Sequence, residues 1–352
     1  MLRNNAKAML TLRKDKTSTE LVEVHNRKTR SKKAESIVYY SHSASSTSGS
    51  NVAPAAGVLA LHKNALKKIH KLSNADFERI CVMIDTNEEP DVGEPLRQEY
   101  WELHKVYERA LRTEMYLGDQ DDLYFEHNLP RDKRTWAGTF LLVGNSGAGK
   151  TFWVTELMLR YFRATKPFAR RTLLYVSPEW EIDKTLRKLK AKRFAFNVIG
   201  IDVSEKALRE SGMDATAYYK TKVEDIVDKH GDHAIIVYDD FMDAAPGMEH
   251  LLRRLYVRGL RTARHKVTSV VSLVHSYASG KNTSQALQSV KFAVFFPRSS
   301  KSRIVMFLRD HLQVPPKEGK ELVERFAKLD RYMIIRMHSP VAIYNSKYLL
   351  LL

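Results

Sequence analysis

One eight-residue segment constrains this chain more than any other part of it. Residues 144–151 match the phosphate-binding pattern G-x-x-x-x-G-K-[ST] at every fixed position. Its members are Gly144, Asn145, Ser146, Gly147, Ala148, Gly149, Lys150 and Thr151. An apolar run, residues 139–143, precedes it, and apolar side chains at helical spacing follow over residues 152–162. This context predicts strand, loop and helix; the alternative is a chance match in a glycine-rich loop.

Strand, loop and helix in this order are what phosphate binding needs. Glycines let backbone N–H groups approach a phosphate closely, and the following helix adds its positive N-terminal end. We expect Lys150 to reach the β- and γ-phosphates and the Thr151 hydroxyl to bind Mg²⁺. The expected ligands are therefore a nucleoside triphosphate and Mg²⁺. The loop leaves ATP or GTP open, because it contacts phosphates and not the base.

Residues 234–240, Ala-Ile-Ile-Val-Tyr-Asp-Asp, supply the second part of the expected site. Their apolar residues indicate a buried strand that ends in two carboxylates. We expect Asp239 to hold the Mg²⁺ shell and Asp240 to orient or deprotonate the attacking water. The alternative is an Asp-Asp turn that caps the next helix.

The following apolar run, residues 268–274, ends at His275 and Ser276. A polar residue at this position can contact both the γ-phosphate and the catalytic acid, and so sense which nucleotide is bound. Both residues are candidates, and an ordinary loop histidine is the alternative. A complete strand–helix segment separates Lys150 from Asp239. Such an insertion is typical of P-loop enzymes that activate water with an acid, and it argues against nucleotide kinases and most GTPases.

The apolar runs after residue 130 determine the expected fold class. They occur at residues 140–143, 173–176, 196–201, 234–238, 269–274 and 292–296, and they alternate with helical or polar stretches. Strands separated by helices predict an α/β fold, a mostly parallel sheet with helices on both faces. We expect this RecA/ASCE-like P-loop NTPase domain over residues 131–352.

The first 130 residues have a different composition. Residues 1–60 mix basic residues with a Ser-rich tract and show no sustained periodicity, so we expect a disordered basic tail. Residues 61–130 contain two helical patterns, one from Leu61 to Leu72 and one after Pro95, so we expect a small α-helical region there.

Charge and cysteine content narrow the class of partner and compartment. The net charge is +17, which predicts an acidic partner such as nucleic acid; the alternative is a solvated basic tail without a partner. Cys81 is the one cysteine, so no internal disulfide can form. No apolar run approaches the roughly 20 residues that span a bilayer, and we expect a soluble intracellular protein with no membrane partner.

Residues 136–335 together resemble the FtsK–HerA superfamily of P-loop ATPases, and within it the poxvirus-type genome-packaging ATPases of large DNA viruses, virophages and Polinton-like elements. Three features carry the resemblance: Asp239-Asp240, the pair Arg264-His265 before the 268–274 strand, and the segment Phe295 to Arg303. Family members commonly have Gln after the sensor strand, where this chain has His275. The resemblance implies an ATPase in a pentameric or hexameric ring that threads double-stranded DNA. It also implies portal or vertex proteins of a viral capsid as partners. The expected location is then an assembly site in the host cytoplasm or nucleus, or the virion.

Basic residues are expected to serve this activity in two ways. Arg254, Arg258 and Arg261 recur at helical spacing, so they form one stripe that can contact DNA phosphates together with Arg264. Arg303, with Arg298 as second choice, is the expected arginine finger for a neighbouring subunit. A solvated helix face and a simple surface arginine are the respective alternatives.

Two other functions remain open from the sequence. One is a helicase or DNA-processing ATPase, which would displace strands on forked DNA. The other is an assembly switch that binds ATP with almost no turnover.

Overall fold

A computed structural model describes the chain in two compact units, residues 1–128 with 340–352, and residues 129–339. The described residues are 8–11, 19–26, 36–42, 59, 72–86, 88–91, 93, 95–111, 114–117, 123–127, 137–165, 170–190, 198–275, 287–299, 301–338 and 340–352. Each unit is described by itself.

The second unit is built on one sheet. Its strands are β6 (Thr139–Val143), β7 (Leu173–Ser177), β8 (Val198–Asp202), β9 (Ile235–Asp239), β10 (Ser269–Val274), β11 (Phe292–Phe295) and β12 (Met333–Arg336). Their order is β12-β11-β6-β10-β9-β7-β8. Neighbouring strands from β11 to β8 are parallel, and β12 is antiparallel to β11. Strands β6, β7 and β9 are buried along their whole length, as expected for strands covered on both faces. The predicted α/β class is confirmed.

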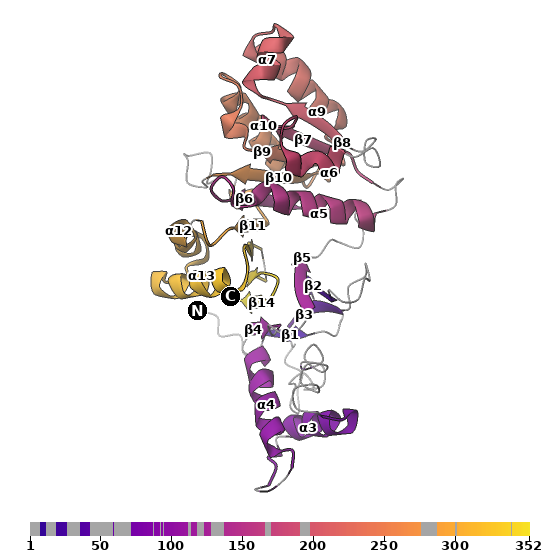
Figure 1. The fold of residues 1–352 in the computed structure, drawn as a ribbon, viewed down its shortest axis with the longest axis vertical. Coiled ribbons are helices and arrows are strands. Elements are labelled where there is room, and N and C mark those ends of the chain that lie inside the picture. Colours follow the sequence, from indigo (N-terminus) through magenta and orange to yellow (C-terminus); the bar gives the residue numbers. More distant parts are fainter. Residues whose placement is uncertain are drawn as a thin grey trace. The chain divides into compact units, whose positions relative to one another are not determined.

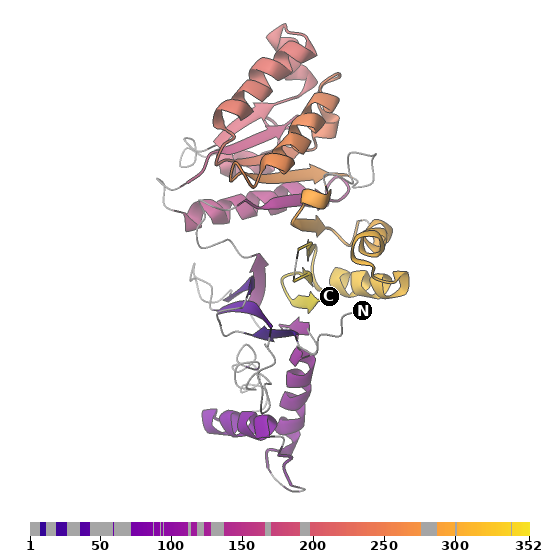
Figure 2. The ribbon, with the colours of Figure 1, turned by 180° about the vertical axis from the view of Figure 1, so that it is seen from behind.

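Helices cover both faces of this sheet. They are α5 (Lys150–Ala164), α6 (Arg187–Lys190), α7 (Glu205–Ser211), α8 (Ala215–Tyr218), α9 (Asp225–His230), α10 (Glu249–Thr262), α12 (Lys301–Leu312) and α13 (Pro316–Leu329), with the short helical turns η2 (Lys184–Leu186), η4 (Tyr219–Glu224) and η5 (Phe241–Asp243). Figures 1 and 2 show α5 on one side of the strands and α9 and α10 on the other. Leu174, Val176, Ile236 and Tyr238 face α9 and α10 in one apolar cluster. Residues of the opposite parity, such as Tyr175, therefore face the other side.

The strand order fixes where the catalytic groups meet. Strand β10 lies between β6 and β9, so the strand before the phosphate loop and the strand with two carboxylates are next-but-one neighbours. The backbone N–H of Gly144 donates to Val274 O at 3.2 Å, and that of Asp240 donates to Leu273 O at 3.3 Å. The ends of the three strands are thereby tied together at the carboxyl edge of the sheet, where ligands bind in open α/β folds.

The first unit contains strands and two helices. Strands β1 (Ala8–Thr11), β3 (Ser36–His42), β2 (Thr19–Asn26) and β5 (Leu123–His127) form an antiparallel sheet in that order. Strands β13 (Ala342–Tyr344), β14 (Tyr348–Leu351) and β4 (Glu114–Tyr116) pair antiparallel in turn. Helices α3 (Asn74–Thr86) and α4 (Arg97–Leu111) share an apolar core. Ser73 caps α3, its hydroxyl accepting from the Asp76 N–H at 3.1 Å.

The tail expected over residues 1–60 differs from the structure where β1, β2 and β3 form. Val22, Val24 and Val38 are fully buried there, because pairing between distant strands creates a core that local composition does not reveal. The helix after Pro95 is confirmed as α4, while residues 61–71 of the other expected helix lie outside the described residues. Residues 340–352 group with residues 1–128 in the structure. The domain boundaries expected at residues 60 and 130 stay predictions. Among the described residues, no helix is both long enough and apolar enough to cross a bilayer.

Candidate functional site

The phosphate loop joins β6 to α5 in the conformation that its glycines permit. Gly147 has φ +74° and Gly149 has φ +106°, values in the left-handed region that side chains disfavour. Gly144 has a different reason: a Cβ there would lie 3.0 Å from both Ala148 Cβ and the Phe296 ring. Because α5 begins at Lys150, the loop ends at the helix N-terminus, which is the place for an anion.

Lys150 is held inside the loop. Its side chain is only 5% exposed, and Nζ donates to Gly144 O at 3.0 Å. Asp240 Oδ1 is 3.6 Å from this Nζ, and His275 Nδ1 is 3.4 Å from it. The ammonium group therefore stands between the loop and the ends of β9 and β10, as expected for a lysine that contacts phosphates.

Asp239 is almost fully buried at the end of β9. Its Oδ2 accepts hydrogen bonds from Tyr175 OH at 2.6 Å and from the Thr151 hydroxyl at 3.3 Å. Burial raises the pKa of Asp239 to about 7; Asp240 adds to this, while Tyr175, Lys150 and Thr151 oppose it. Its other oxygen, Oδ1, is buried without a hydrogen-bond partner. A buried acceptor beside a threonine hydroxyl fits a cation site, so the residues are suited to Mg²⁺.

Asp240 and His275 complete the cluster. Asp240 has φ +42°, a strained value that turns its side chain out of the strand direction. His275 Nε2 lies 3.5 Å from Asp240 Oδ2 and 3.7 Å from Asp243 Oδ2. The structure thus brings His275 together with Lys150 and Asp240, as a sensor requires, while Ser276 lies outside the described residues.

The two candidate finger arginines differ in their surroundings. Arg303 is exposed on α12, and its guanidinium donates to His275 O of the same chain at 2.9 Å. Arg298 donates to Ala327 O at 3.3 Å and lines a hollow against α13 with Lys301 and Lys328. Arg303 thus contacts a residue of the candidate nucleotide site, and a role of either arginine in a neighbouring subunit stays a prediction.

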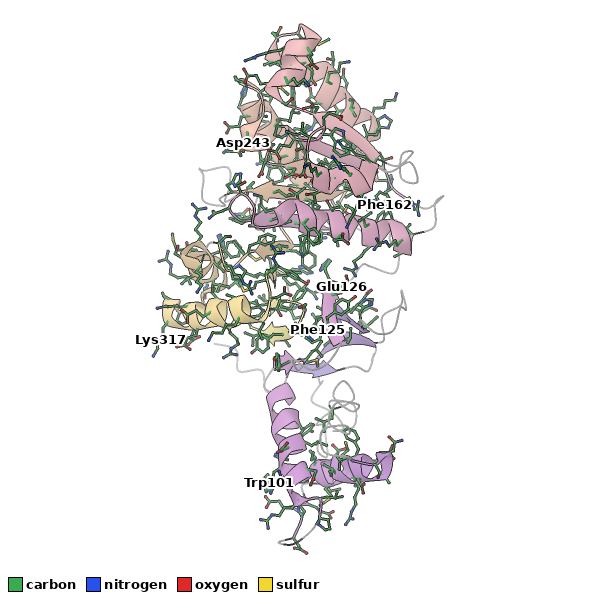
Figure 3. The ribbon with its side chains drawn as sticks, in the orientation of Figure 1. Trp101, Phe125, Glu126, Phe162, Asp243 and Lys317 are labelled. Atoms are coloured by element: carbon green, nitrogen blue, oxygen red, sulfur yellow. The ribbon has the colours of Figure 1, made fainter. Side chains whose placement is uncertain are left out.

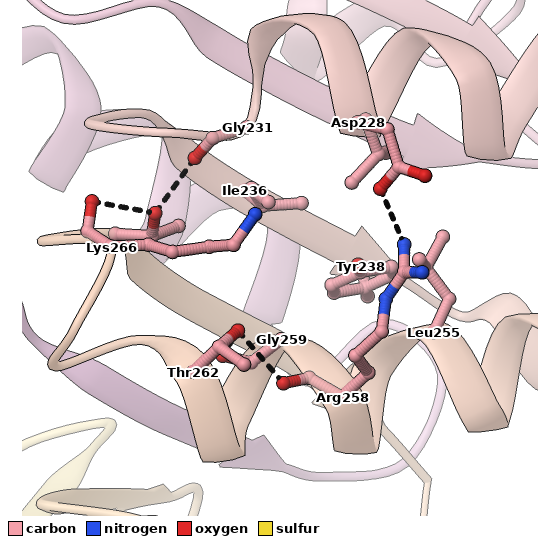
Figure 4. Close-up of a pocket in the computed structure, with 11 residues that line it drawn as sticks. Asp228, Gly231, Ile236, Tyr238, Leu255, Arg258, Gly259, Thr262 and Lys266 are labelled. Atoms are coloured by element: carbon pink, nitrogen blue, oxygen red, sulfur yellow. Dashed lines mark hydrogen bonds and ion pairs between the residues drawn. The ribbon is translucent and has the colours of Figure 1, made fainter.

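All four expected arginines are exposed: Arg254, Arg258 and Arg261 on α10, and Arg264 just beyond the end of that helix. Arg258 is engaged, because it donates to Asp228 at 2.7 Å and to Glu224 at 3.4 Å. Figure 4 shows Arg258 and Asp228 among the residues that line a cavity of about 120 Å³ between α9, β9 and α10. A guanidinium held by two carboxylates is less available to a phosphate, so Arg258 is the least suited of these arginines to bind DNA. DNA binding by the stripe stays a prediction.

Tyr175 is the residue of the site that the sequence analysis missed. Its hydroxyl is fully buried, and burial raises its pKa well above the usual range, with Asp239 adding to the effect. The phenol therefore stays protonated and donates to the carboxylate. Tyr175 lies on β7, which pairs with β9, the strand that ends at Asp239. Residues of β7 alternate between the two faces of the sheet, and this alternation was the only sequence signal that pointed to Tyr175.

The phosphate loop between β6 and α5, the acid pair at the end of β9, and β10 inserted between those strands define a P-loop NTPase fold. No protein-family model matches the chain, and no curated protein matches it. Among solved structures, the DNA-packaging ATPase B204 of Sulfolobus turreted icosahedral virus is similar at TM-score 0.37 and 10% identity, over 60% of this chain and 98% of that one.

Two further structures are similar to the chain. The cytoplasmic domain of the type VII secretion ATPase EccC from Thermomonospora curvata has TM-score 0.37 and 12% identity, over 67% of this chain and 29% of that one. The KaiC-like protein PH0186 from Pyrococcus horikoshii has TM-score 0.29 and 12% identity, over 46% of this chain and 71% of that one. These similarities are weak, and the class rests on the geometry described above.

Proposed function

We propose that this chain hydrolyses ATP as one subunit of a ring that translocates double-stranded DNA, packaging a viral genome into a capsid. One observation carries the proposal. Lys150, Thr151, Asp239, Asp240 and His275 converge at one edge of a parallel sheet, beside a glycine loop that ends at a helix N-terminus. This set contains a phosphate-binding cation, cation ligands and an acid placed to act on water.

Lys150 and the loop bind and orient the nucleotide. In the structure the ammonium donates to Gly144 O, so it can exchange that weak partner for phosphate oxygens without moving its backbone. Thr151 and Asp239 are the residues that would hold Mg²⁺, which supplies charge neutralisation at the phosphates. Tyr175 fixes the Asp239 carboxylate in one orientation through its 2.6 Å hydrogen bond.

Asp240 is placed to act on the attacking water. It is less buried than Asp239, with 27% of its side chain exposed, so water can reach it. His275 lies within 3.5 Å of its Oδ2 and also near Lys150, so one imidazole contacts both the acid and the phosphate-binding cation. Such a residue can report the γ-phosphate to the water-activating group. Asp240 then orients or deprotonates the water for in-line attack.

The DNA part of the proposal is supported by charge and by family resemblance. The net charge of +17 and the exposed arginines of α10 and its C-terminal end provide sequence-independent contacts to phosphates. The ring, the capsid partners and the packaging role come from the resemblance to genome-packaging ATPases described for residues 136–335.

Steady-state ATP hydrolysis, measured across protein concentration with and without duplex DNA, tests the proposal. We expect the rate per subunit to rise with concentration and to rise again with duplex, and added salt to erase the DNA effect because the release of counterions from DNA drives that contact. A low rate that is indifferent to both variables contradicts the motor and favours an ATP-dependent switch. Strand displacement on forked DNA instead favours a helicase.

A further inference from the structure

A second cluster of ligand-type side chains lies far from the nucleotide site in the sequence, within the first unit. Strands β2 and β5 pair antiparallel, with Glu23 opposite Glu126 and His25 opposite Tyr124. Residues two apart on a strand share a face, so all four side chains lie on one face of this pair. On β5 the next residue, Phe125, is buried on the other face (Figure 3).

The geometry of this cluster is compact. His25 Nε2 lies 3.0 Å from Glu23 Oε2 and 3.3 Å from Glu126 Oε2. One ligand atom from each of the three residues lies within 4.8 Å of the other two. The His25 side chain is only 10% exposed, and its ring stacks on Tyr124 with centroids 5.6 Å apart. The imidazole is therefore held in place with Nε2 directed between two carboxylates.

The register brings two carboxylates of like charge to facing positions of β2 and β5. Like charges directly opposite one another on neighbouring strands destabilise a sheet. A divalent cation between the three ligand atoms offsets both negative charges at once.

We propose that Glu23, His25 and Glu126 bind a Zn²⁺ ion. One imidazole nitrogen and two carboxylate oxygens are a ligand set that Zn²⁺ accepts, with bonds of about 2.0–2.2 Å. Ligand atoms bound at such lengths in a tetrahedron stand about 3.3 Å apart, close to the two distances from Nε2. The nitrogen ligand favours Zn²⁺ over Mg²⁺ and Ca²⁺, which prefer oxygen ligands only. The three ligands leave a fourth position for water.

The ion would join two strands that are distant in the chain. Glu23 and Glu126 belong to β2 and β5, and more than half of the first unit's sequence lies between them. A cation that binds only the folded sheet stabilises it by mass action, so a free Zn²⁺ concentration of 100 times Kd raises the folded-to-unfolded ratio about 100-fold. This site is separate from the proposed ATPase activity and does not depend on it.

Calorimetric titration of the chelator-treated full chain with Zn²⁺ tests the proposal. The protein carries Asp239→Asn throughout, which removes a carboxylate of the nucleotide site as a competing ligand. We expect one Zn²⁺ per chain with Kd in the micromolar range or below, no comparable binding of Mg²⁺, and a rise in melting temperature of several degrees. The absence of stoichiometric Zn²⁺ binding overturns the proposal.

Three further variants identify the ligands. His25→Gln and Glu126→Gln should each weaken Zn²⁺ binding at least tenfold, whereas Glu20→Gln on the same strand should leave it unchanged. If both variants bind Zn²⁺ as tightly as the parent, the three residues form an ion-pair cluster only, and the metal site is contradicted.

Discussion

At the scale of single residues, burial and charged neighbours together set the pKa of Asp239. Its carboxyl group lies at the end of a fully buried strand, and the strand register places a phenol beside it and a second acid after it. Burial keeps this group poised between its protonated and charged forms near neutral pH. Its ionisation is therefore linked both to stability and to cation binding.

Asp239→Asn should stabilise the metal-free protein more at pH 8 than at pH 5. The folded-state pKa of about 7 is raised above the ordinary value of 3.8, so the folded protein binds the proton more tightly and loses stability as pH rises through that window. Because one pKa unit corresponds to about 1.4 kcal/mol, the effect can reach about 4 kcal/mol at pH 8. Thermal unfolding of both proteins at the two pH values measures it.

The exposed neighbour Asp243 supplies the control for this experiment. Its side chain is 66% exposed, so Asp243→Asn should change the melting temperature little at either pH. An Asp239→Asn difference that is the same at pH 5 and pH 8 would contradict a raised pKa.

Tyr175→Phe should weaken Mg²⁺ binding, so that hydrolysis needs a higher Mg²⁺ concentration. The lost hydrogen bond opposed the raised pKa of Asp239, so the carboxylate becomes harder to ionise and the acid limb of the pH profile moves to higher pH. A hydrogen bond to a charged group is worth about 1.5–3 kcal/mol, so the Mg²⁺ concentration at half-maximal rate should rise about tenfold or more.

Tyr238→Phe is the matched control for Tyr175→Phe. Tyr238 is a buried tyrosine on β9, and its hydroxyl has no hydrogen-bond partner. It faces α10 on the other side of the sheet, so its removal should leave the Mg²⁺ dependence unchanged. Equal effects of the two substitutions would mean that Tyr175 acts through packing alone.

At the scale of elements, α10 shows how one helix serves packing and charge at once. Leu252, Leu255 and Leu260 are buried against the sheet, while the arginines lie on the exposed side. The sequence spacing predicted that Arg254, Arg258 and Arg261 share one face. It did not reveal that Glu224 and Asp228 on the neighbouring turn would engage Arg258, because those residues come close only through packing of η4 and α9 beside α10.

Arg254→Ala should reduce DNA-stimulated hydrolysis more than Arg258→Ala. A free arginine that contacts one phosphate contributes about one unit to the slope of log affinity against log salt, and its removal should lower that slope accordingly. Arg258 is held by two carboxylates, so its loss should change the slope little. Duplex binding measured across salt concentrations compares the two variants. Equal slopes of log affinity against log salt in the two variants would contradict a DNA contact made by α10.

At the scale of the whole molecule, the proposed ring makes hydrolysis depend on assembly. Arg303 donates to His275 O within its own chain, so action in a neighbouring site requires that it leave this carbonyl. Arg303→Ala should lower turnover by about 10³-fold if it is the finger. Lys150→Ala should abolish turnover because phosphate binding is lost.

Mixing the two inactive variants distinguishes a shared site from a local one. In a ring of random composition, about a quarter of the sites combine an intact Lys150 with an intact Arg303 from the neighbour. An equimolar mixture should therefore recover activity that neither variant has alone. No recovery in a mixture shown to co-assemble would place the role of Arg303 within its own chain, with Arg298→Ala as the next variant to mix.

The sequence by itself determined the class of fold and predicted the candidate nucleotide site. The glycine loop, the strand before it, the helix after it and the acid pair are local patterns, because each depends on residues within a few positions of one another. Strand–helix alternation is also local, which is why β6 to β11 were all predicted.

Only the tertiary structure decided which distant side chains meet. Tyr175 reaches Asp239 because β7 and β9 pair in one register, and His275 reaches Lys150 because β10 lies between β6 and β9. The cluster of Glu23, His25 and Glu126 depends on the pairing of β2 with β5, about a hundred residues later in the chain. Such pairings gain free energy only after a long loop has closed, so no local sequence pattern can record them.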